Sequence, residues 1–509
     1  MMQAVLCAQP IPVGELGKYT MPLFIVDEVR EITSARVLTD WEARVAKQGI
    51  RRLCMDSREV GEGDLFVAIK GERMDGHDFV LAALKKGAVG ALVQDGFRLP
   101  ASMPQRPAHG SARRPVVLGV PDTLKAYQQL AAYHRNRFQI PVVAVTGSNG
   151  KTTTKEMTAD VLAQRWPVLR TEGNLNNRIG VPQTLFKLAP RHKAAVIEMG
   201  VDQTGQTARL CEIVRPTIGL ITNIGPDHLE FFGTMDVSAQ AKGELLEFLP
   251  PEGQAVLNAD DAYFGYLAAR ARCDVLSFGL SSKAEVRAER LTLGSRQGTQ
   301  FHLRLPGRSK PQVVTMRVHG LHNVLNALAA AAVGHAMELS PATIAEGLAR
   351  FRPAAMRSQV LTVGGIRIIN DCYNANPASM KAAIDLLLAL GADRRSVAVL
   401  GDMLELGPSA PALHREVGAY LAERGVSQLI ACGALGKQVA EGARAAGMAP
   451  EHVVHEPDAA RAGAALKALV QDGDVVLVKA SRGMKMEQAV EMLAGSFRDT
   501  ATGKQAQGH

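Results

Sequence analysis

Cysteine pairs, long apolar runs and aromatic side chains are all scarce in this 509-residue sequence. The six cysteines occur singly and form no Cys-x-x-Cys pair, which argues against a zinc-ribbon or thioredoxin-like site. No apolar run approaches the roughly 20 residues that a membrane-spanning helix needs. Unpaired cysteines in a chain of this length are typical of a reduced protein, so we expect a cytoplasmic location and no membrane span.

Neither sign of charge dominates the chain. Lysine and arginine total 58 and acidic residues total 50, which leaves a net charge of +8. No basic tract is interleaved with aromatic residues, so nucleic acid is not an expected partner. Either anionic small-molecule substrates or ordinary surface charge would account for this excess of positive charge.

The length predicts about three domains, at roughly 100–200 residues per domain. Apolar strands alternate with helical stretches in the second and third sections, which predicts parallel, doubly wound sheets. Residues 291–318 alternate as antiparallel strands do, so the second sheet is not expected to be purely parallel. The expected divisions are an N-terminal extension, three domains and a polar tail, the two ends being disordered, at residues 1–27, 28–139, 140–352, 353–495 and 496–509.

The strongest local signal is a phosphate-binding loop. A buried strand at residues 142–145 runs into a glycine-containing turn that opens a helix, where backbone N–H groups point at phosphate oxygens. Gly147 and Gly150 permit close approach of the backbone. Lys151 is placed to contact the β- and γ-phosphates, and the Thr152 hydroxyl to bind Mg²⁺.

This loop is shorter than the standard one, because Val145 stands where the first glycine would fall. By itself it predicts only a nucleoside triphosphate, since kinases, GTPases and helicases share it.

Two further strands end in polar side chains. Glu198 ends the apolar strand 194–199, and His228 follows the strand 218–222. Ligands bind at the carboxyl ends of strands in doubly wound sheets, which makes Glu198 a magnesium candidate and His228 a metal or acid–base candidate. A surface carboxylate and a structural histidine are the alternatives. No spacing argument singles out Lys242.

The third section opens with a basic residue and a polar loop. Arg357 follows the expected linker, from which it could reach phosphates of the facing domain. The Asp/Asn-rich segment 370–379 precedes a helix, and Ser379 could be its N-cap in an ordinary turn. Asn323 and Asn326 begin an alanine-rich helix, where their amides could read an adenine edge. A solvated arginine and a polar helix start are the alternatives.

Taken in order, these motifs resemble the Mur ligases, ATP-dependent amide-bond ligases that build the peptidoglycan stem peptide. The resemblance covers roughly residues 56–494 and implies a three-domain α/β protein. The loop 371–377, Asp-Cys-Tyr-Asn-Ala-Asn-Pro, is similar to that of the member that adds D-alanyl-D-alanine. Members that add diaminopimelate or lysine carry an Asp-Asn-Pro-Arg motif, which is absent here. Folylpolyglutamate synthetases also differ at this loop.

The resemblance implies a set of residues around ATP. They are Gly147, Ser148, Asn149, Gly150, Lys151, Thr152, Thr153, Asn323, Asn326, Arg357 and Asp371. The two helix asparagines are implied to lie beside adenine, and Arg357 and Asp371 near the phosphates and ribose. Residues 354–356 are Ala-Ala-Met, where relatives often have glycine before the arginine.

Magnesium and the catalytic residues follow from the same resemblance. The implied magnesium ligands are Thr152, Glu198, His228 and Lys242. His228 is implied to help hold a second Mg²⁺, and Lys242 matches the family's carbamylated lysine. The implied catalytic residues are Lys151, His228, Lys242 and Arg357.

The implied substrates are UDP-N-acetylmuramoyl-tripeptide and D-alanyl-D-alanine, joined through an acyl phosphate by a monomeric enzyme. Residues 56–58 and 75–79 resemble the uridine-nucleotide-binding domain of the later-acting ligases, and Asn374 and Asn376 lie in the loop implied to meet the dipeptide. The implied substrate contacts are Ser57, Arg58, Asp75, His77, Asn374 and Asn376. The alternatives are a related ligase with another amine substrate, a P-loop ATPase or GTPase module, and a non-catalytic binder.

Overall fold

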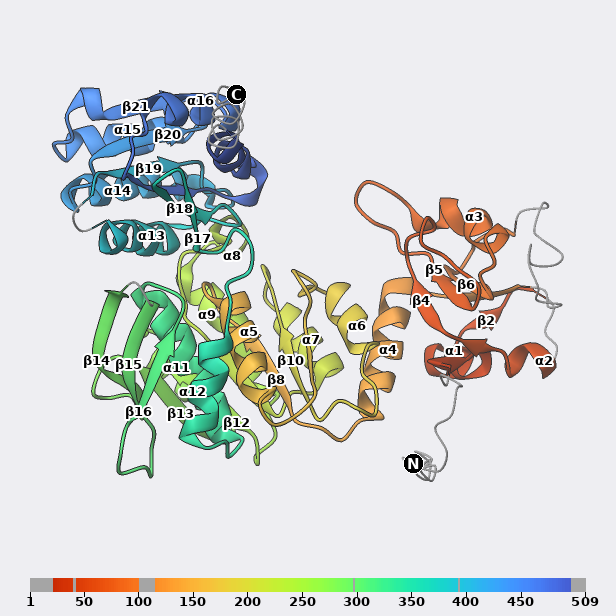
Figure 1. Ribbon diagram of the computed structural model, residues 1–509. Coiled ribbons are helices and arrows are strands. Elements are labelled where there is room, and N and C mark those ends of the chain that lie inside the picture. Colours follow the sequence, from red (N-terminus) through yellow and green to blue (C-terminus); the bar gives the residue numbers. More distant parts are fainter. Residues whose placement is uncertain (1–21, 40–42, 100–114, 296–297, 392–393, 496–509) are drawn as a thin grey trace, which may run out of the picture. The chain divides into compact units, whose positions relative to one another are not determined.

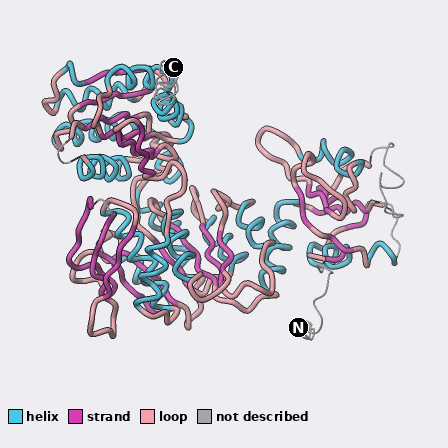
Figure 2. Tube along the Cα trace, in the orientation of Figure 1, coloured by secondary structure: helices cyan, strands magenta, loops and turns pink. Residues whose placement is uncertain are grey.

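The computed structural model describes residues 22–39, 43–99, 115–295, 298–391 and 394–495 (Figures 1 and 2). Residues 1–21 of the expected extension and the whole expected tail lie outside this described part. Helix α1 begins at Val26, so regular structure starts before the boundary expected at residue 28. None of the described helices combines the length and hydrophobicity needed to cross a bilayer.

The chain divides into two compact units, Met1–Tyr133 and His134–His509. The first contains a five-stranded sheet in the order β2-β7-β6-β5-β4, with only β2 antiparallel to its neighbour. Its strands are Arg36–Val37, Arg52–Cys54, Asp64–Val67, Gly90–Gln94 and Val116–Val120 for β2, β4, β5, β6 and β7. Strand β5 is buried along its whole length, as expected of a parallel strand covered on both faces.

Short elements complete the first unit. Strands β1 and β3 form a separate two-stranded ribbon. Their bounds are Phe24–Ile25 and Gly49–Ile50 for β1 and β3. The helices α1 to α4 span Val26–Thr33, Ala43–Ala46, Val80–Lys85 and Thr123–Asn136, and the last of these ends just past the unit boundary at Tyr133.

The second unit begins with a nine-stranded sheet in the order β16-β15-β14-β13-β12-β11-β8-β10-β9. Strands β8 to β14 pair in parallel, whereas β15 and β16 are antiparallel, as residues 291–318 predict. The bounds of β8 to β16 are Val142–Thr146, Val168–Arg170, Ala194–Glu198, Ile218–Ile221, Gln254–Asn258, Asp274–Gly279, Val286–Ser295, Gly298–Arg304 and Gln312–Met316.

Eight helices described in this part connect or cover the nine strands. They are Lys151–Leu162, Gly180–Leu185, Gln206–Val214, Leu229–Phe232, Met235–Glu247, Phe264–Ala268, Leu321–Ala336 and Pro341–Arg350 for α5 to α12. Helix α11 is buried from Asn326 to Gly334, a stretch rich in alanine, and these small side chains let it pack closely on α5.

The second unit ends with a six-stranded sheet in the order β17-β18-β22-β19-β20-β21, parallel except for the β17–β18 hairpin. The bounds of β17 to β22 are Gln359–Val363, Ile366–Asp371, Ser396–Leu400, Gln428–Cys432, Val453–Glu456 and Val475–Lys479. Helices α13 to α15 share one apolar core with the sheet, and α16 shares the other. The bounds of α13 to α16 are Pro377–Leu390, Ala410–Glu423, Gly436–Ala445 and Ala459–Leu469. The two cores lie on opposite faces, so this sheet is doubly wound as predicted.

Gly347 offers a test of the packing between α5 and α12. A Cβ atom at Gly347 would lie 2.5 Å from the Val161 Cα atom of α5. We expect Gly347→Ala to lower the free energy of unfolding by about 1–3 kcal/mol, because backbone cannot move aside as a flexible side chain can. Urea unfolding of the full chain measures this. Gly265→Ala, in the exposed helix α10 with nothing within 4 Å, is the matched control. Equal losses in both variants would contradict the packing argument.

Candidate active site

The phosphate-binding loop lies between strand β8 and helix α5, as predicted. Gly147 and Gly150 have φ angles of 132° and 78°, in the region that favours glycine. A Cβ atom at Gly147 would lie 2.1 Å from Thr222 Oγ1, and one at Gly150 would lie 2.3 Å from Asn326 Oδ1. Both positions therefore require glycine for two reasons, backbone conformation and lack of space.

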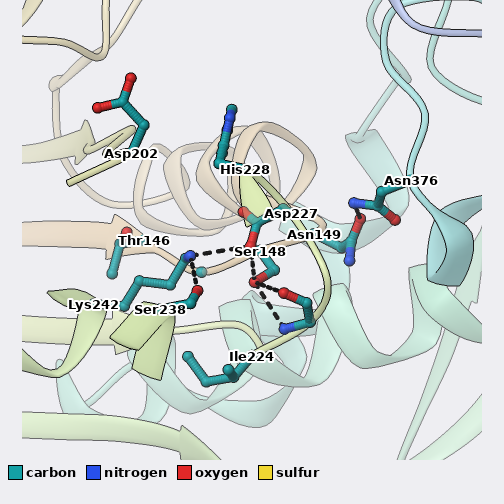
Figure 3. Close-up of polar contacts among 12 residues, drawn as sticks. Thr146, Ser148, Asn149, Asp202, Ile224, Asp227, His228, Ser238, Lys242 and Asn376 are labelled. Atoms are coloured by element: carbon teal, nitrogen blue, oxygen red, sulfur yellow. Dashed lines mark hydrogen bonds and ion pairs between the residues drawn. The ribbon is translucent and has the colours of Figure 1, made fainter. Parts of the chain in front are cut away.

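The segment after strand β11 holds this loop in place. Thr222 Oγ1 donates to the Asn149 carbonyl at 2.6 Å, and Asn149 N–H donates to Asn223 Oδ1 at 3.0 Å. Ser148 Oγ donates to Asp227 Oδ1 at 2.6 Å (Figure 3). The sequence interpretation noted the segment that contains Thr222, Asn223 and Asp227 but assigned no role to these three residues. Their position at the carboxyl end of a strand next to β8 is the signal that could have identified them.

Lys151 begins helix α5 and folds over the loop. Its Nζ donates to the Gly147 carbonyl at 2.6 Å and to the Ser148 carbonyl at 3.1 Å. The ammonium therefore lies beside the backbone that would cradle phosphates, while Thr153 lies in the same first helical turn. This geometry suits the predicted contact of Lys151 with a nucleotide.

Glu198 ends strand β10 and is almost fully buried. Its Oε1 accepts from Thr152 Oγ1 at 3.1 Å and from Asn176 Nδ2 at 2.8 Å. Its Oε2 is buried without a hydrogen-bond partner among the described residues. A buried carboxylate oxygen without a partner is costly, and a hard cation such as Mg²⁺ would satisfy it. Thr152 and Glu198 therefore fit a magnesium ion, and Asn176 is a neighbour that the sequence interpretation missed.

Lys242 lies on α9 with only 1% of its surface exposed. Its Nζ donates to Ser238 Oγ at 2.5 Å and to Asp227 Oδ1 at 3.1 Å (Figure 3). The same atom lies 4.5 Å from the centre of the Phe232 ring. Burial lowers the pKa of Lys242 to about 8, although the neighbouring Asp227 carboxylate opposes the shift. A lysine with this pKa is partly a neutral amine near pH 8, which is the form that reacts as a nucleophile.

Asp227 is a buried carboxylate between two lysines. Burial by itself would raise its pKa, but the positive charges of Lys242 and Lys151 outweigh burial and hold the pKa below its usual value. Its Oδ2 is buried and has no hydrogen-bond partner among the described residues. Asp227 is therefore an ionised group that joins the phosphate loop to Lys242, and it has a second unpaired oxygen.

The His228 side chain points in a different direction from the side chain of Asp227. His228 has a φ angle of 51°, and its ring points away from the Lys242–Asp227 contact (Figure 3). Its Nδ1 lies 2.6 Å from Glu405 Oε2, a residue of the C-terminal sheet domain that the sequence interpretation missed. Within the described residues no three His, Cys, Asp or Glu side chains gather as a metal cluster. The structure joins Thr152 to Glu198 but forms no direct contact between this pair and His228 or Lys242, so the four-residue metal site stays a prediction.

Arg357 and Asp371 lie near one another in the C-terminal domain. The Arg357 guanidinium stacks on the Tyr373 ring at 3.8 Å. Asp371 Oδ2 accepts from Lys479 Nζ at 2.6 Å, and Asp371 Oδ1 accepts from Ser358 N–H at 2.7 Å. Burial would raise the pKa of Asp371, but the Lys479 charge outweighs burial and keeps the pKa low. Lys479 is a further residue that the sequence interpretation missed.

The backbone on both sides of Arg357 is left-handed. Met356 and Ser358 have φ angles of 59° and 48°. A glycine would adopt such an angle without strain, whereas Met356 pays the cost of the Cβ atom in this conformation.

Asn323 and Asn326 are nearly buried in the first turns of α11. Asn323 Nδ2 donates to the His319 carbonyl at 2.8 Å, and Asn326 Oδ1 accepts from Thr154 Oγ1 at 3.1 Å. These contacts, with the close approach to Gly150, place Asn326 against the phosphate loop. A role of either residue beside adenine stays a prediction.

The loop before α13 reaches the phosphate loop. Asn376 Nδ2 donates to Asn149 Oδ1 at 2.7 Å (Figure 3). Asn376 is also the N-cap of α13, and Ser379 occupies the N3 position of a capping box, so the suggestion that Ser379 is the cap is wrong. Asn374 Oδ1 accepts from Ala375 N–H within the same loop.

The predicted substrate residues of the first unit form local pairs. Arg58 donates to Asp56, and its side chain is 86% exposed, in the turn that contains Ser57. His77 Nδ1 lies 2.6 Å from Asp75 Oδ1, and Gln94 N–H donates to His77 Nε2 at 2.8 Å. Since Nε2 accepts a hydrogen bond, the ring proton is on Nδ1, which donates a hydrogen bond to Asp75. His77 and Asp75 thus fix the loop, and their contact with a substrate stays a prediction.

A phosphate loop beside buried carboxylates, followed by a second α/β sheet that contacts the loop, defines a class of nucleotide-using enzymes. Three family models match successive parts of the chain. They are the Mur ligase family catalytic domain at residues 49–135, the Mur ligase middle domain at 145–334, and the Mur ligase glutamate ligase domain at 356–482.

Relatives match nearly the whole chain. The UDP-N-acetylmuramoyl-tripeptide--D-alanyl-D-alanine ligase of Bacillus subtilis is 35% identical, over 88% of this chain and 94% of that protein. The crystal structure of MurF from Acinetobacter baumannii is 33% identical with a TM-score of 0.83, over 93% of this chain and 99% of that one. MurF from Thermotoga maritima, in complex with ADP, is 27% identical with a TM-score of 0.76, over 88% and 98%.

The chain belongs to the Mur ligase family. The resemblance drawn from the motifs and the expected three-domain α/β architecture are both confirmed. Family membership, with the ADP bound to the Thermotoga maritima relative, implies that the chain uses ATP. A free-standing ATPase or GTPase module does not account for matches across all three domains.

Gly150 offers a test of the nucleotide site. We expect Gly150→Ala to weaken ADP binding at least about tenfold, because left-handed strain of roughly 1–2 kcal/mol adds to the collision with Asn326. Titration calorimetry measures the affinity. Gly205→Ala is the control, since Gly205 has a similar φ of 86° but nothing within 4 Å. If both variants bind ADP as tightly as the wild type, the loop does not hold the phosphates.

Proposed function

We propose that this chain joins D-alanyl-D-alanine to the tripeptide of UDP-N-acetylmuramoyl-tripeptide, with ATP converted to ADP and phosphate. The relative from Bacillus subtilis is named for this activity, and the match covers 94% of its length. The structural observation that supports it most is the Asn376–Asn149 hydrogen bond. It brings the loop that resembles the dipeptide-adding member against the phosphate loop, so the amine and the γ-phosphate would meet.

In the first step, an oxygen of the tripeptide's terminal carboxylate attacks the γ-phosphorus of ATP. A new O–P bond forms, the bond to the β-phosphate oxygen breaks, and ADP leaves. Lys151, whose Nζ lies against the phosphate loop, is proposed to contact the transferred group, and Arg357 is the basic residue expected at the phosphates. Activation is necessary because an ionised carboxylate is a poor electrophile.

Only some of the expected magnesium ligands have a geometry in the structure that fits the ion. Thr152 and Glu198 would hold the ion, and we further propose His228 and the carbamate of Lys242 as ligands of a second ion. When bound, Mg²⁺ neutralises charge on the phosphate oxygens. The unpaired Oε2 of Glu198 supports this assignment.

In the second step, the free amine of D-alanyl-D-alanine attacks the acyl carbonyl. The new C–N bond forms, the C–O bond to phosphate breaks, and the amine proton leaves to solvent or to the departing phosphate. Asn374 and Asn376 are proposed to orient the dipeptide. Water must stay away from the acyl phosphate, which contact between the central and C-terminal domains would achieve.

We propose that Ser57, Arg58, Asp75 and His77 contact the UDP part of the substrate. The Arg58–Asp56 and His77–Asp75 pairs help to fix two separate loops, and the exposed Arg58 offers a charge for a diphosphate. The adenine role of Asn323 and Asn326 and the ribose role of Asp371 belong to the same proposal, as do a monomeric state and a cytoplasmic location.

The lowered pKa of Lys242 supports the carbamylation that we propose for this residue. The neutral amine attacks CO₂, a C–N bond forms, and one proton is released to give an anionic carbamate. The reactive fraction is small at pH 6 and about half near pH 8, because the ammonium form predominates below the pKa.

We therefore expect ligase activity to fall when CO₂ is removed and to recover with bicarbonate, more rapidly at pH 8 than at pH 6. Mass spectrometry of the native protein checks for the added carboxyl group. Lys242→Met should be inactive and unresponsive to bicarbonate. Full activity of that variant would contradict the assignment.

The overall assignment is tested by phosphate release from ATP with UDP-muramoyl-tripeptide. We expect release only when D-alanyl-D-alanine is present, with a matching pentapeptide product in the mass spectrum. Lys151→Ala should reduce turnover at least about a hundredfold, because the charge at the transferred phosphate is lost. Phosphate release with a single amino acid instead would show that this ligase uses a different amine substrate. Release without any amine would favour a plain ATPase.

A further inference from the structure

His228 and Glu405 form a contact between the central and C-terminal domains. Glu405 lies in the loop 401–407 between β19 and α14. Its carboxylate lies 2.6 Å from His228 Nδ1, and its carbonyl accepts from Glu230 N–H at 3.1 Å. Both the side chain and the main chain of this one residue therefore engage the start of helix α8.

Both members of the pair have a left-handed backbone. His228 has a φ of 51° and Glu405 a φ of 64°, although neither is glycine. Such angles persist only where the surroundings enforce them, and they gather at functional sites. Gly407, with a φ of 58°, comes so close to α8 that a Cβ would lie 3.2 Å from Glu230 Cα. The loop and the start of α8 thus match each other in shape.

The loop 401–407 is anchored firmly within its own domain. Asp402 Oδ1 accepts from Leu435 N–H and Gly436 N–H at the start of α15, at 3.0 and 2.8 Å. Met403 N–H donates to His414 Nε2, and Leu404 N–H donates to Ser481 Oγ, each at 2.9 Å. The position of Glu405 is therefore set by the C-terminal domain and not by His228.

The chemistry of the contact fixes one arrangement of the histidine ring. The Glu405 carboxylate accepts a hydrogen bond from the Nδ1–H group of His228, so the lone pair of Nε2 is available to bind a ligand. Metal-binding histidines commonly donate their other N–H to a carboxylate, which sets the orientation of the ring. Here that carboxylate comes from a different domain.

We propose that Glu405 is a positioning residue, which fixes the tautomer and orientation of His228 only when the C-terminal domain is docked. This inference rests on the role proposed for His228. It links contact between the domains to completion of the site, so that a carboxylate would be activated only when the C-terminal domain, which carries the amine loop, is in place.

Two substitutions test the proposal in the full-length enzyme. Glu405→Gly suits the left-handed backbone and removes the carboxylate, whereas Glu405→Gln retains an oxygen acceptor. We expect Glu405→Gly to lower kcat about 10–100-fold and Glu405→Gln to recover part of that loss, with the dipeptide KM unchanged. Glu441→Gln, an exposed glutamate of the same domain, is the matched control. A kcat within twofold of wild type for Glu405→Gly would overturn the proposal.

A double-mutant cycle with His228→Ala separates this proposal from the proposed function. If Glu405 acts through His228, Glu405→Gly has no further effect once His228 is replaced. Additive losses would overturn the positioning role and leave the ligase assignment intact. Full activity of His228→Ala would instead remove the role proposed for His228, and the inference with it.

Hydrogen–deuterium exchange gives a readout that does not depend on turnover. We expect Glu405→Gly to speed exchange in residues 228–233 and Glu441→Gln to leave it unchanged, with equal thermal transitions in both variants. Unchanged exchange in Glu405→Gly would overturn the claim that the pair fastens the two domains. If Glu405→Gly unfolds at a lower temperature than the wild type, kcat and hydrogen–deuterium exchange are compared between Glu405→Gln and the wild type instead.

Discussion

The buried carboxylate of Asp227 is the contact on which the rest of the site depends. It accepts a hydrogen bond from Ser148 of the phosphate loop and another from the buried amine of Lys242. Taking a carboxylate and a lysine out of water is costly unless each satisfies the other. The pair therefore fixes the phosphate loop relative to α9, while burial, which the Asp227 carboxylate opposes, lowers the pKa of the Lys242 amine.

Close packing holds the other side of the phosphate loop. Asn326 lies so near Gly150 that no side chain fits between them, and the alanine-rich α11 places it there. The loop is thus bounded by the β11 segment on one side and by α11 on the other. A loop fixed in this way needs little rearrangement to bind phosphates, which lowers the entropy lost on binding.

Four of the nine described non-glycine residues with positive φ angles lie where the C-terminal domain approaches the central domain or the expected phosphates. Met356 and Ser358 flank Arg357, while His228 and Glu405 face one another, and all four have positive φ angles. Strain of this kind is maintained only by surrounding contacts, such as the Ser358–Asp371 and His228–Glu405 hydrogen bonds. The domain contact is therefore built from specific polar pairs.

The sequence by itself determined the alternation of strands and helices, the phosphate loop, and the strand-terminal Glu198. Each of these is written in neighbouring residues, whose spacing follows from the periodicity of a strand or helix. It also gave the family, because several such motifs occur in one order.

Only the tertiary structure decided which distant residues meet. Strand order and helix packing bring together Asp227 with Lys242, Asn149 with Asn376, and His228 with Glu405, and the partners lie up to 227 positions apart in the sequence. Local spacing carries no information about such pairs. The lowered pKa of Lys242 and the unpaired oxygen of Glu198 likewise arise from burial, which depends on the whole fold.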